Sequence, residues 1–435
     1  MSYNPDPTRA ATPVRTTSMN DPYGPRSWRS MMVQLGGKNR ALNEFSVERE
    51  GEVVEENLVM LHGYGAGLGF FYKNFEGISR VKGLKLYALD MLGMGRSTRP
   101  PFKVNAKDQQ GKISEAENWF IDALEEWRVL RKIDKFTLLG HSMGGYMAVA
   151  YALKYPGHVN KLILASPVGI PADPYATKSE IPDQSTIENE MLQDQEEDIV
   201  NKPNANGSNG SRNAKAKGNA EPTSDDPPRR RIPKWASYLW DANVSPFSIV
   251  RWAGPLGPRF VSGWTSRRFS HLPETEAQAL HEYAYSLFRQ RGSGEYALAY
   301  ILAPGAFARS PLIDRIQKVG RQPLGLSGAP SAAVGAGKRE TGYPVVMMYG
   351  ENDWMDVAGG LAAEQKLKEA KAAALATATP REKQEERGSA RVVIIQKAGH
   401  HLYLDGHEEF NEVIRREMEE TKRDLKKQRE QNGVL

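Results

Sequence analysis

The sequence of 435 residues contains no cysteine. It therefore has no disulfide, no thiolate nucleophile, and no zinc or iron–sulfur site with cysteine ligands. Long apolar runs are also missing: no stretch reaches the roughly 18 apolar residues that predict a membrane-spanning helix. No secretory signal opens the chain. We therefore expect a mixed globular protein that folds in water, of a kind compatible with a reducing compartment.

An excess of one charge is also nearly absent. Lys and Arg together number 58 against 53 Asp and Glu, which leaves a net charge of +5. Proteins that bind nucleic acid gather basic residues on one face, with aromatic side chains that stack on bases, whereas the surplus here is scattered. We expect no nucleic-acid partner. The hydrophobic content of 40% is ample for a sizeable core.

The first 45 residues are polar and contain several prolines that would break a helix. We expect a disordered N-terminal tail over 1–45. Arginines among serines and threonines give it a weak organelle-targeting character, while Asp6 and Asp21 count against that interpretation because transit peptides are poor in acids.

Residues 46–170 have the pattern of an α/β core. Short apolar runs predict four buried strands, at 58–61, 84–89, 136–139 and 161–165. The pair Ser114 and Glu117 fits a capping box at the start of a helix whose apolar residues continue to Leu130, and a second helix is expected at 146–155. Strands that alternate with helices favour a mostly parallel sheet covered on both faces.

This regularity stops at a charged insert over 180–231. Residues 180–200 carry eight acids and no base, and 202–231 carry seven bases and three acids. Such a segment has too little apolar surface to order itself, so we expect a disordered, solvated linker, with a regulatory or membrane-surface arm as the alternative.

The second half returns to a folded pattern. Residues 232–320 are rich in aromatic side chains at helical spacing and predict a helical lid, and 343–415 restore the core with strands at 345–349 and 392–395. Within this part, 364–390 is expected to be an exposed helical insert. The charged end, 416–435, is expected to be a solvated helix or tail. The order indicates one α/β domain with an inserted lid.

The strongest chemical signal is the G-x-S-x-G sequence of Gly140, His141, Ser142, Met143 and Gly144. It follows a predicted strand and precedes a predicted helix, which is the context of a nucleophile elbow. The glycines are required because a Cβ at either flank would collide with the tight turn. This context predicts Ser142 as the nucleophile.

A serine nucleophile needs a base that is oriented by an acid, and in such folds the chain order is Ser, Asp or Glu, then His. Asp353 follows the strand at 345–349 in a Gly-x-x-Asp turn, and Asp356 could replace it. His400 follows the strand at 392–395, with His401 next to it. We expect Asp353 to be the acid and His400 the base.

Negative charge on the reacting carbonyl oxygen requires two backbone N–H donors. Met143, after the nucleophile, should supply one, and the Gly-rich turn at 62–65 should supply the other, from Tyr64 or Gly65. That turn lacks the lysine of a phosphate-binding loop. We therefore expect no nucleotide, no other cofactor and no metal. Asp90, after the second strand, is expected to cap a loop.

The chain resembles the α/β-hydrolase family, and within it a lipid-active subfamily. This subfamily includes the N-acyl-phosphatidylethanolamine lipase, a lipase coactivator, the fungal cardiolipin-specific deacylase and lysophosphatidic acid acyltransferases. The resemblance covers roughly 50–170, 235–320 and 343–415. It rests on LHGYGAG at 61–67, GHSMGGY at 140–146, LKYP at 153–156 with LIL at 162–164, the stretch 243–258, and GHHLYLD at 399–405.

The resemblance implies Ser142 as nucleophile, Asp353 as acid and His400 as base. His400 and Asp405 fit the H-x4-D pattern that the subfamily links to acyl transfer, although Asp405 would equally serve as a loop residue that caps the last helix. The coactivator lacks the nucleophilic serine that this chain keeps. The animal members shift the acid within its turn, which leaves Asp353 and Asp356 both open.

We therefore expect a serine acyl-ester hydrolase for glycerophospholipids, close to a phospholipase or cardiolipin deacylase, that can also act as a lysophosphatidic acid acyltransferase in phospholipid remodelling. Its partners would be a phospholipid or lysophospholipid and a peripheral membrane surface. The alternatives are an esterase for small soluble substrates and a non-catalytic lipid-surface scaffold. The resemblance places the protein in the mitochondrion first, with the cytosol or the lipid droplet second.

Overall fold

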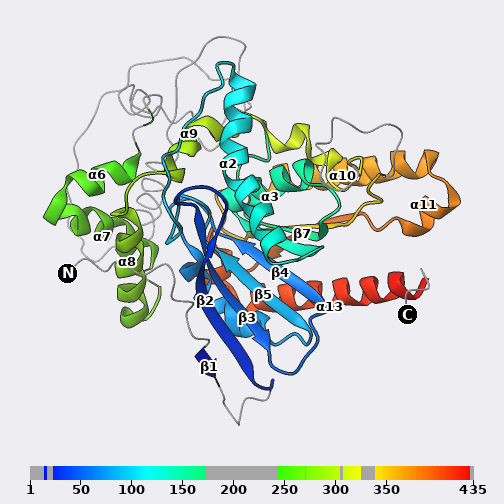
Figure 1. Cartoon of the computed structure of the whole chain (residues 1–435), viewed down its shortest axis with the longest axis horizontal. Coiled ribbons are helices and arrows are strands. Elements are labelled where there is room, and N and C mark those ends of the chain that lie inside the picture. Colours follow the sequence, from blue (N-terminus) through cyan, green and yellow to red (C-terminus); the bar gives the residue numbers. More distant parts are fainter. Residues whose placement is uncertain are drawn as a thin grey trace, which may run out of the picture.

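A nine-stranded sheet forms the centre of the protein (Figure 1). The computed structural model describes residues 14–16, 23–172, 243, 245–269, 271–303, 307–324 and 339–431. The predicted insert at 180–231 lies outside the described residues, as do 1–13 and 17–22 of the predicted tail, 232–242 of the predicted lid and 432–435 of the charged end. In spatial order, the strands are β1 (Val14–Thr16), β2 (Arg26–Gln34), β3 (Ala41–Arg49), β5 (Leu84–Leu89), β4 (Glu56–Leu61), β6 (Phe136–His141), β7 (Val159–Ala165), β8 (Pro344–Gly350) and β9 (Ser389–Ile395).

The strands from β5 to β9 pair in parallel, whereas β1, β2 and β3 pair antiparallel and join the sheet through β5. Every strand predicted from an apolar run is present, with bounds that differ by a few residues. The α/β fold with a mostly parallel sheet is therefore confirmed. Parallel strands are buried on both faces, which explains why they read as continuous apolar runs.

Side chains from alternate strand positions enter two cores, one on each face of the sheet. In β4, Val59 and Leu61 face one core, and Leu58 and Met60 face the other. The first core is completed by α2 (Gln109–Leu130), α3 (Met143–Lys154), α9 (Leu298–Ile301) and α10 (Val357–Thr377). The second is completed by α1 (Tyr72–Ile78), α12 (Leu402–Asp405), α13 (His407–Gln431) and the lid helices.

The described part of the lid contains three main helices: α6 (Pro246–Trp252), α7 (Gly257–Arg268) and α8 (Glu274–Phe288). Figure 1 shows them together at one end of the molecule, beside the sheet. Shorter elements are α11 (Pro380–Glu385) and the 3-10 turns Leu68–Phe71, Gly254–Leu256, Gly294–Ala297, Leu312–Asp314 and Ile316–Lys318. The helical lid is thus present over its described residues.

The prediction of a disordered tail over 1–45 was wrong for residues 14–16, which form β1, and for residues 26–45. The latter segment holds β2 and most of β3, which pair along nine residues each. Arg26 is buried and donates to the Ser79 hydroxyl at 3.0 Å. The polar sequence misled the prediction because antiparallel strands near a sheet edge alternate polar and apolar side chains instead of forming an apolar run.

One helix prediction also needs correction. Helix α2 begins at Gln109, where the Asp108 side chain accepts from the Gly111 N–H, so Ser114 and Glu117 lie inside the helix and are not its cap. The segment predicted as an exposed helical insert at 364–390 is largely helical, in α10 and α11, and most of its side chains are at least partly exposed. Leu367 of α10 nevertheless packs in the first core.

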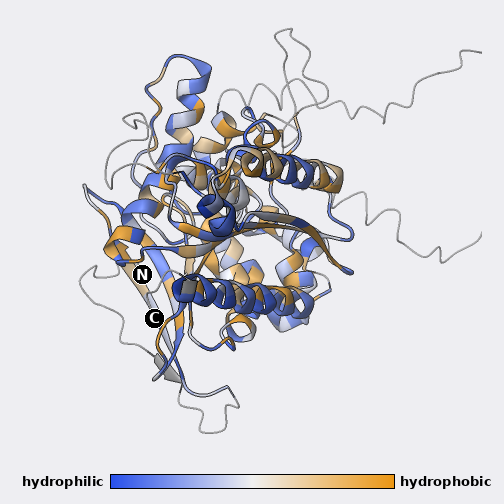
Figure 2. Ribbon diagram, turned by 90° about the vertical axis from the view of Figure 1, so that its right-hand side faces the viewer, coloured by the Kyte–Doolittle hydropathy of each residue, from blue (hydrophilic) through white to orange (hydrophobic). Residues whose placement is uncertain are grey.

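Helix α13 contains most of the charged end expected over 416–435, but this end is not fully solvated, because Glu417, Met418 and Thr421 are buried. Its outer face is charged, and it is mostly hydrophilic in Figure 2. Its inner face, however, buries Phe410, Ile414 and Met418 against the sheet. The sequence predicted its charge but not its buried stripe, because the few apolar residues are diluted among the eight acids and seven bases of 408–431. No helix in the described residues is long and apolar enough to cross a membrane.

Candidate active site

Ser142 lies in a sharp turn between β6 and α3, at the carboxyl end of the sheet. Its backbone has φ 53° and ψ −118°, a conformation that L residues rarely adopt. The turn brings backbone so close that a Cβ on Gly140 would lie 2.2 Å from the Gly144 carbonyl oxygen, and one on Gly144 would lie 2.6 Å from the Leu61 carbonyl oxygen. The structure therefore has the strained geometry of a nucleophile elbow.

His400 and Asp353 meet at the same edge of the sheet. Asp353 follows β8 and His400 follows β9, and the carboxyl ends of neighbouring parallel strands lie side by side. The Nδ1 of His400 lies 3.2 Å from Oδ1 of Asp353, and both side chains are buried. With the Nδ1 proton donated to the carboxylate, Nε2 is the basic nitrogen of the ring.

The Asp353 carboxylate is held by more than the histidine. The Met355 N–H donates to its Oδ1 at 3.0 Å, and the Ser166 hydroxyl donates to Oδ2. Burial alone raises the pKa of the Asp353 carboxyl, but the hydrogen bonds from His400 and Ser166 outweigh burial and leave this pKa below its ordinary value. Asp353 is thus ionised at neutral pH.

Asp356, the other candidate for the acid, has a different partner. Its Oδ1 accepts from the Ala358 N–H at 2.9 Å and caps α10. This is the ordinary N-cap contact. Of the two aspartates, the geometry therefore joins Asp353 to His400.

His141, which precedes the nucleophile, links the elbow to the histidine loop. Its Nε2–H donates to the His400 carbonyl oxygen at 2.9 Å, and the two imidazole rings lie 4.8 Å apart. Burial, together with the nearby His400, lowers the pKa of His141 well below its ordinary value, so this ring stays neutral. The contact brings the main chain at Ser142 and that at His400 together.

The predicted oxyanion donors lie around the elbow. A Cβ on Gly63 would be 3.0 Å from the Ser142 Cβ, so the turn that holds Tyr64 and Gly65 runs directly beside the nucleophile. Met143 is the first residue of α3, and the N–H groups of a helix's first turn point away from the helix. The positive end of the helix dipole favours negative charge at this point.

Asp90 caps a loop, as the sequence predicted. Its carboxylate accepts from the Leu68 and Arg96 N–H groups at 2.7 and 2.8 Å. His62 nearby accepts from the Met91 N–H through Nε2, which leaves its proton on Nδ1, facing the Gly63 carbonyl. Burial lowers the pKa of His62. This histidine is therefore neutral, and its hydrogen bonds stabilise the Gly-rich turn.

The lid packs onto the same turn. The rings of Tyr64 and Phe247 stack with centroids 5.3 Å apart, and Phe247 stacks in turn on Phe288 of α8 at 4.5 Å. A Cβ on Gly65 would lie 3.2 Å from the Phe247 ring. The aromatic side chains of the lid therefore form one wall next to the predicted oxyanion donors.

Asp405 joins the loop before His400 to the lid. Its carboxylate accepts from the Gly399 N–H at 3.1 Å and from Arg268 of α7 at 3.1 and 3.2 Å. Arg268 also donates to Nδ1 of His401 at 2.9 Å. His401, the histidine adjacent to the predicted base, is therefore bonded to the lid.

Sequence reasoning missed three contributors, namely Ser166, Arg268 and the bond of His141 to the histidine loop. No local signal marks them, because each comes from a segment more than 100 residues from its partner. Among the described residues, no group of three or more His, Asp and Glu side chains is placed to hold a metal ion.

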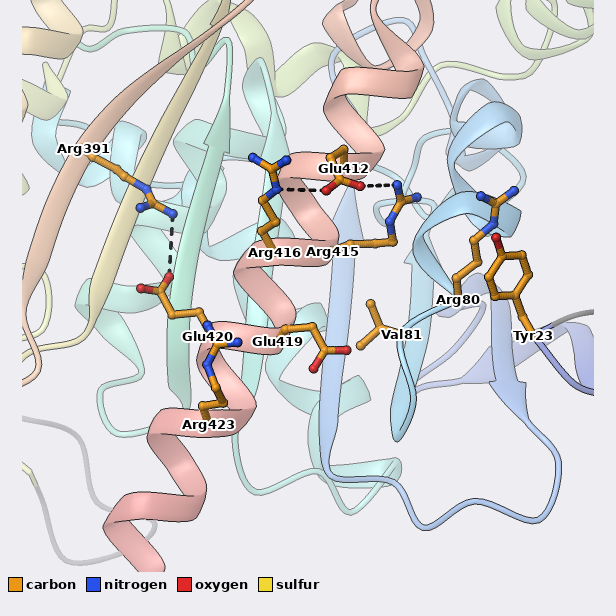
Figure 3. Close-up of a pocket in the computed structure, with 10 residues that line it drawn as sticks. All are labelled: Tyr23, Arg80, Val81, Arg391, Glu412, Arg415, Arg416, Glu419, Glu420 and Arg423. Atoms are coloured by element: carbon orange, nitrogen blue, oxygen red, sulfur yellow. Dashed lines mark hydrogen bonds and ion pairs between the residues drawn. The ribbon is translucent and has the colours of Figure 1, made fainter.

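A surface groove of about 680 Å³ lies away from this site, beside α13 (Figure 3). Its lining contains none of the predicted site residues. Arginines and glutamates of the groove pair with each other, as Arg415 and Arg416 do with Glu412. We assign the groove no role in the chemistry at Ser142.

The chain is similar to several known proteins. The family model described as the alpha/beta hydrolase fold matches residues 56–248. A 1-acylglycerol-3-phosphate O-acyltransferase of Arabidopsis thaliana is 33% identical over 72% of this chain, which spans only 58% of that relative. The human 1-acylglycerol-3-phosphate O-acyltransferase ABHD5 is 30% identical over 82% of this chain and 76% of its own.

A third relative is named for a different activity. The (lyso)-N-acylphosphatidylethanolamine lipase of Bos taurus is 28% identical over 82% of this chain and 77% of its own length. In all three cases the similarity covers more of the chain than the family model does.

Proposed function

The chain belongs to the α/β-hydrolase family and to its lipid-active subfamily, and from this premise we propose that it is a serine acyl-ester hydrolase for glycerophospholipids. One observation carries the proposal, namely that His400 is bonded both to Asp353 and to the strained turn that presents Ser142. Its Nδ1 bonds to Asp353, and its carbonyl oxygen accepts from His141, the residue before Ser142. Relatives named as acyltransferases and as a lipase support a lipid acyl ester as substrate.

In the proposed reaction, Ser142 Oγ attacks the acyl carbonyl carbon while His400 Nε2 takes the serine proton. The Asp353 carboxylate orients the imidazole and stabilises its protonated form. The N–H groups of Met143 and Tyr64, or of Gly65 in place of Tyr64, bind the oxyanion. His400 then protonates the leaving alcohol. Water hydrolyses the acyl-enzyme, which releases the fatty acid and restores Ser142.

The same acyl-enzyme accounts for transfer as well as hydrolysis. A lysophosphatidic acid hydroxyl that reaches the acyl-enzyme before water would take the acyl group by the same chemistry, with His400 as the base. We therefore include lysophosphatidic acid acyltransferase activity in the proposal. Which reaction dominates depends on how well the pocket excludes water and holds the acceptor.

Substrate delivery from a membrane surface forms part of the proposal. Four large apolar side chains, which we call the lid patch, are exposed on α6, α7 and the turn between them: Ile249, Trp252, Leu256 and Phe260. Trp252 is 75% exposed, and Arg259 next to Phe260 is exposed as well. Apolar side chains with an adjacent cation suit insertion at an anionic lipid surface.

Phe247 connects this patch to the site. It lies on α6 with Ile249 and Trp252, but faces inward onto Tyr64. A bilayer that holds the outer face of α6 would therefore sit on the far side of the helix from the predicted oxyanion turn. Cardiolipin as a preferred substrate and the mitochondrion as location remain predictions from the resemblance.

The test is product analysis with purified wild type and Ser142→Ala on liposomes of mixed phospholipids that include cardiolipin. The reaction is run with and without added lysophosphatidic acid. We expect free fatty acid and lysolipid from wild type alone, and acyl chains on the acceptor when it is present. A soluble-ester preference would favour the small-substrate esterase, and liposome binding without any lipid change in either protein would favour the scaffold.

A further inference from the structure

The H-x4-D aspartate joins the lid to the loop that carries His400. On the core side, the Asp405 carboxylate accepts from the N–H of Gly399, the residue before His400. On the lid side, Oδ1 and Oδ2 both accept from Nη2 of Arg268, and Nε2 of His271 lies 3.3 Å from Oδ1.

Arg268 also bonds directly to the loop that carries His400. Its Nε donates to Nδ1 of His401, the residue after His400. The last residue of α7 is thus bonded directly to one neighbour of His400, and through Asp405 to the other. The Arg268 and Asp405 side chains are 14% and 11% exposed, so water competes little for these bonds.

These bonds leave Asp405 little capacity to act on a substrate. Both carboxylate oxygens already accept hydrogen bonds, one of them from the backbone beside the catalytic base. The pKa of Asp405 is lowered to about 2: burial raises it, but His271 and Arg268 outweigh burial. A carboxylate that is ionised and fully bonded is a poor proton acceptor for an incoming hydroxyl.

We infer that Asp405 is a positioning residue, which with Arg268 ties helix α7 of the lid to the loop that aligns His400. In this role it serves hydrolysis and transfer alike. The inference rests on the proposed function of His400 as the base. It also connects lid and chemistry, because a displacement of α7 would break the Arg268 bonds to His401 and to Asp405 at once.

The kinetic test uses p-nitrophenyl butyrate, a small soluble ester that does not depend on a membrane. Asp405→Ala and Arg268→Ala should each lower kcat roughly 10- to 100-fold through a misplaced base, with KM within about twofold because neither residue contacts the ester. The double variant should be no worse than the poorer single one. Asp405→Asn, which keeps an oxygen for the Gly399 N–H, should lose less.

A matched control breaks another lid contact. Glu276 of α8 pairs with Lys73 of α1 at 3.0 Å and with the Tyr72 hydroxyl, not with the residues that flank His400. Glu276→Gln should leave kcat near the wild-type value, which separates the specific tie from any loosening of the lid.

Hydrogen–deuterium exchange of the peptide at 398–405 gives a readout independent of activity. Exchange should accelerate in Asp405→Ala and Arg268→Ala but not in Glu276→Gln. If wild type cleaves neither this ester nor phospholipid in liposomes, the proposed function fails while exchange still decides the tie. The inference would be overturned if the Asp405 and Arg268 variants matched wild type in exchange and in ester hydrolysis, and lost only transfer to lysophosphatidic acid.

Discussion

Two aspartates three residues apart in the turn after β8 have different partners, and this difference decides their roles. Asp353 is buried against His400, whereas Asp356 caps α10. Sequence alone left both open, because either could face the sheet edge from the same turn. Distance to the histidine is a tertiary property that no local pattern contains.

For this pair we predict opposite effects on activity and stability. Asp353→Asn should lower kcat roughly 10⁴-fold, since the uncharged partner neither fixes the histidine tautomer nor stabilises its protonated form. Asp356→Ala should leave kcat close to wild type and cost about 1 kcal/mol of unfolding free energy through the lost cap. Ester kinetics and urea unfolding of both variants check this, and a catalytic loss confined to Asp356→Ala would reverse the assignment.

Glu56, at the opposite end of the sheet, makes stability depend on pH. Burial raises its pKa from 4.5 to about 7, and the hydrogen bonds from Thr137 and Asn160 offset only part of that effect. Between these two values the folded protein holds a proton that the unfolded chain has lost. Its contribution to stability therefore falls as pH rises from about 4.5 to about 7 and is constant above.

Glu56→Gln should remove this slope, because the amide does not titrate. Relative to wild type, the variant should gain up to about 3 kcal/mol of unfolding free energy between pH 5 and pH 8. Urea unfolding at four pH values measures the difference. Parallel curves for the two proteins would show that Glu56 does not titrate in this range.

At the scale of whole elements, the predictable strands were those buried on both faces. The runs at 58–61 and 136–139 predict β4 and β6 because nearly every side chain in them is apolar. The antiparallel strands β2 and β3 escaped prediction because their polar residues find partners only in the fold, as Arg26 does with Ser79. The charged C-terminal segment was misjudged for the same reason.

Helix α13 is fixed to the sheet by a buried ion pair. Lys161 of β7 is fully buried and lies 2.6 Å from Glu417 and 2.9 Å from Glu420. Lys161→Met would leave Glu417 buried with Arg391 as its remaining cation, and we expect a loss of about 3 kcal/mol of unfolding free energy.

The control for this change is Arg416→Met on the same helix. Arg416 is 75% exposed and pairs with Glu412, so its loss should cost less than about 1 kcal/mol. Chemical unfolding of the two variants measures the difference. Equal losses would mean that the buried pair does not anchor α13.

At the scale of the whole molecule, the lid presents one face to the site and another to solvent. We predict that Trp252→Ser with Phe260→Ser weakens binding to anionic liposomes about 10-fold or more, because two large apolar side chains no longer enter the lipid. Hydrolysis of a soluble ester should be unchanged. Liposome flotation and ester kinetics check both expectations.

The matched control replaces exposed apolar residues outside the lid. Val129 and Leu130, at the end of α2, are both more than half exposed. Val129→Ser with Leu130→Ser should bind liposomes as wild type does. Equal loss in both double variants would show that general surface hydrophobicity, and not the lid patch, holds the protein to lipid.

The central claim is that Ser142 is a nucleophile activated by His400 and Asp353. The most direct measurement is reaction of the purified protein with a fluorophosphonate, followed by mass spectrometry of the peptide that holds the elbow. We predict a covalent adduct on Ser142 in wild type, much slower labelling in His400→Ala and Asp353→Asn, and none at this residue in Ser142→Ala. A wild-type protein that stays unlabelled at Ser142, or labelling at one rate in wild type and His400→Ala, would contradict the account.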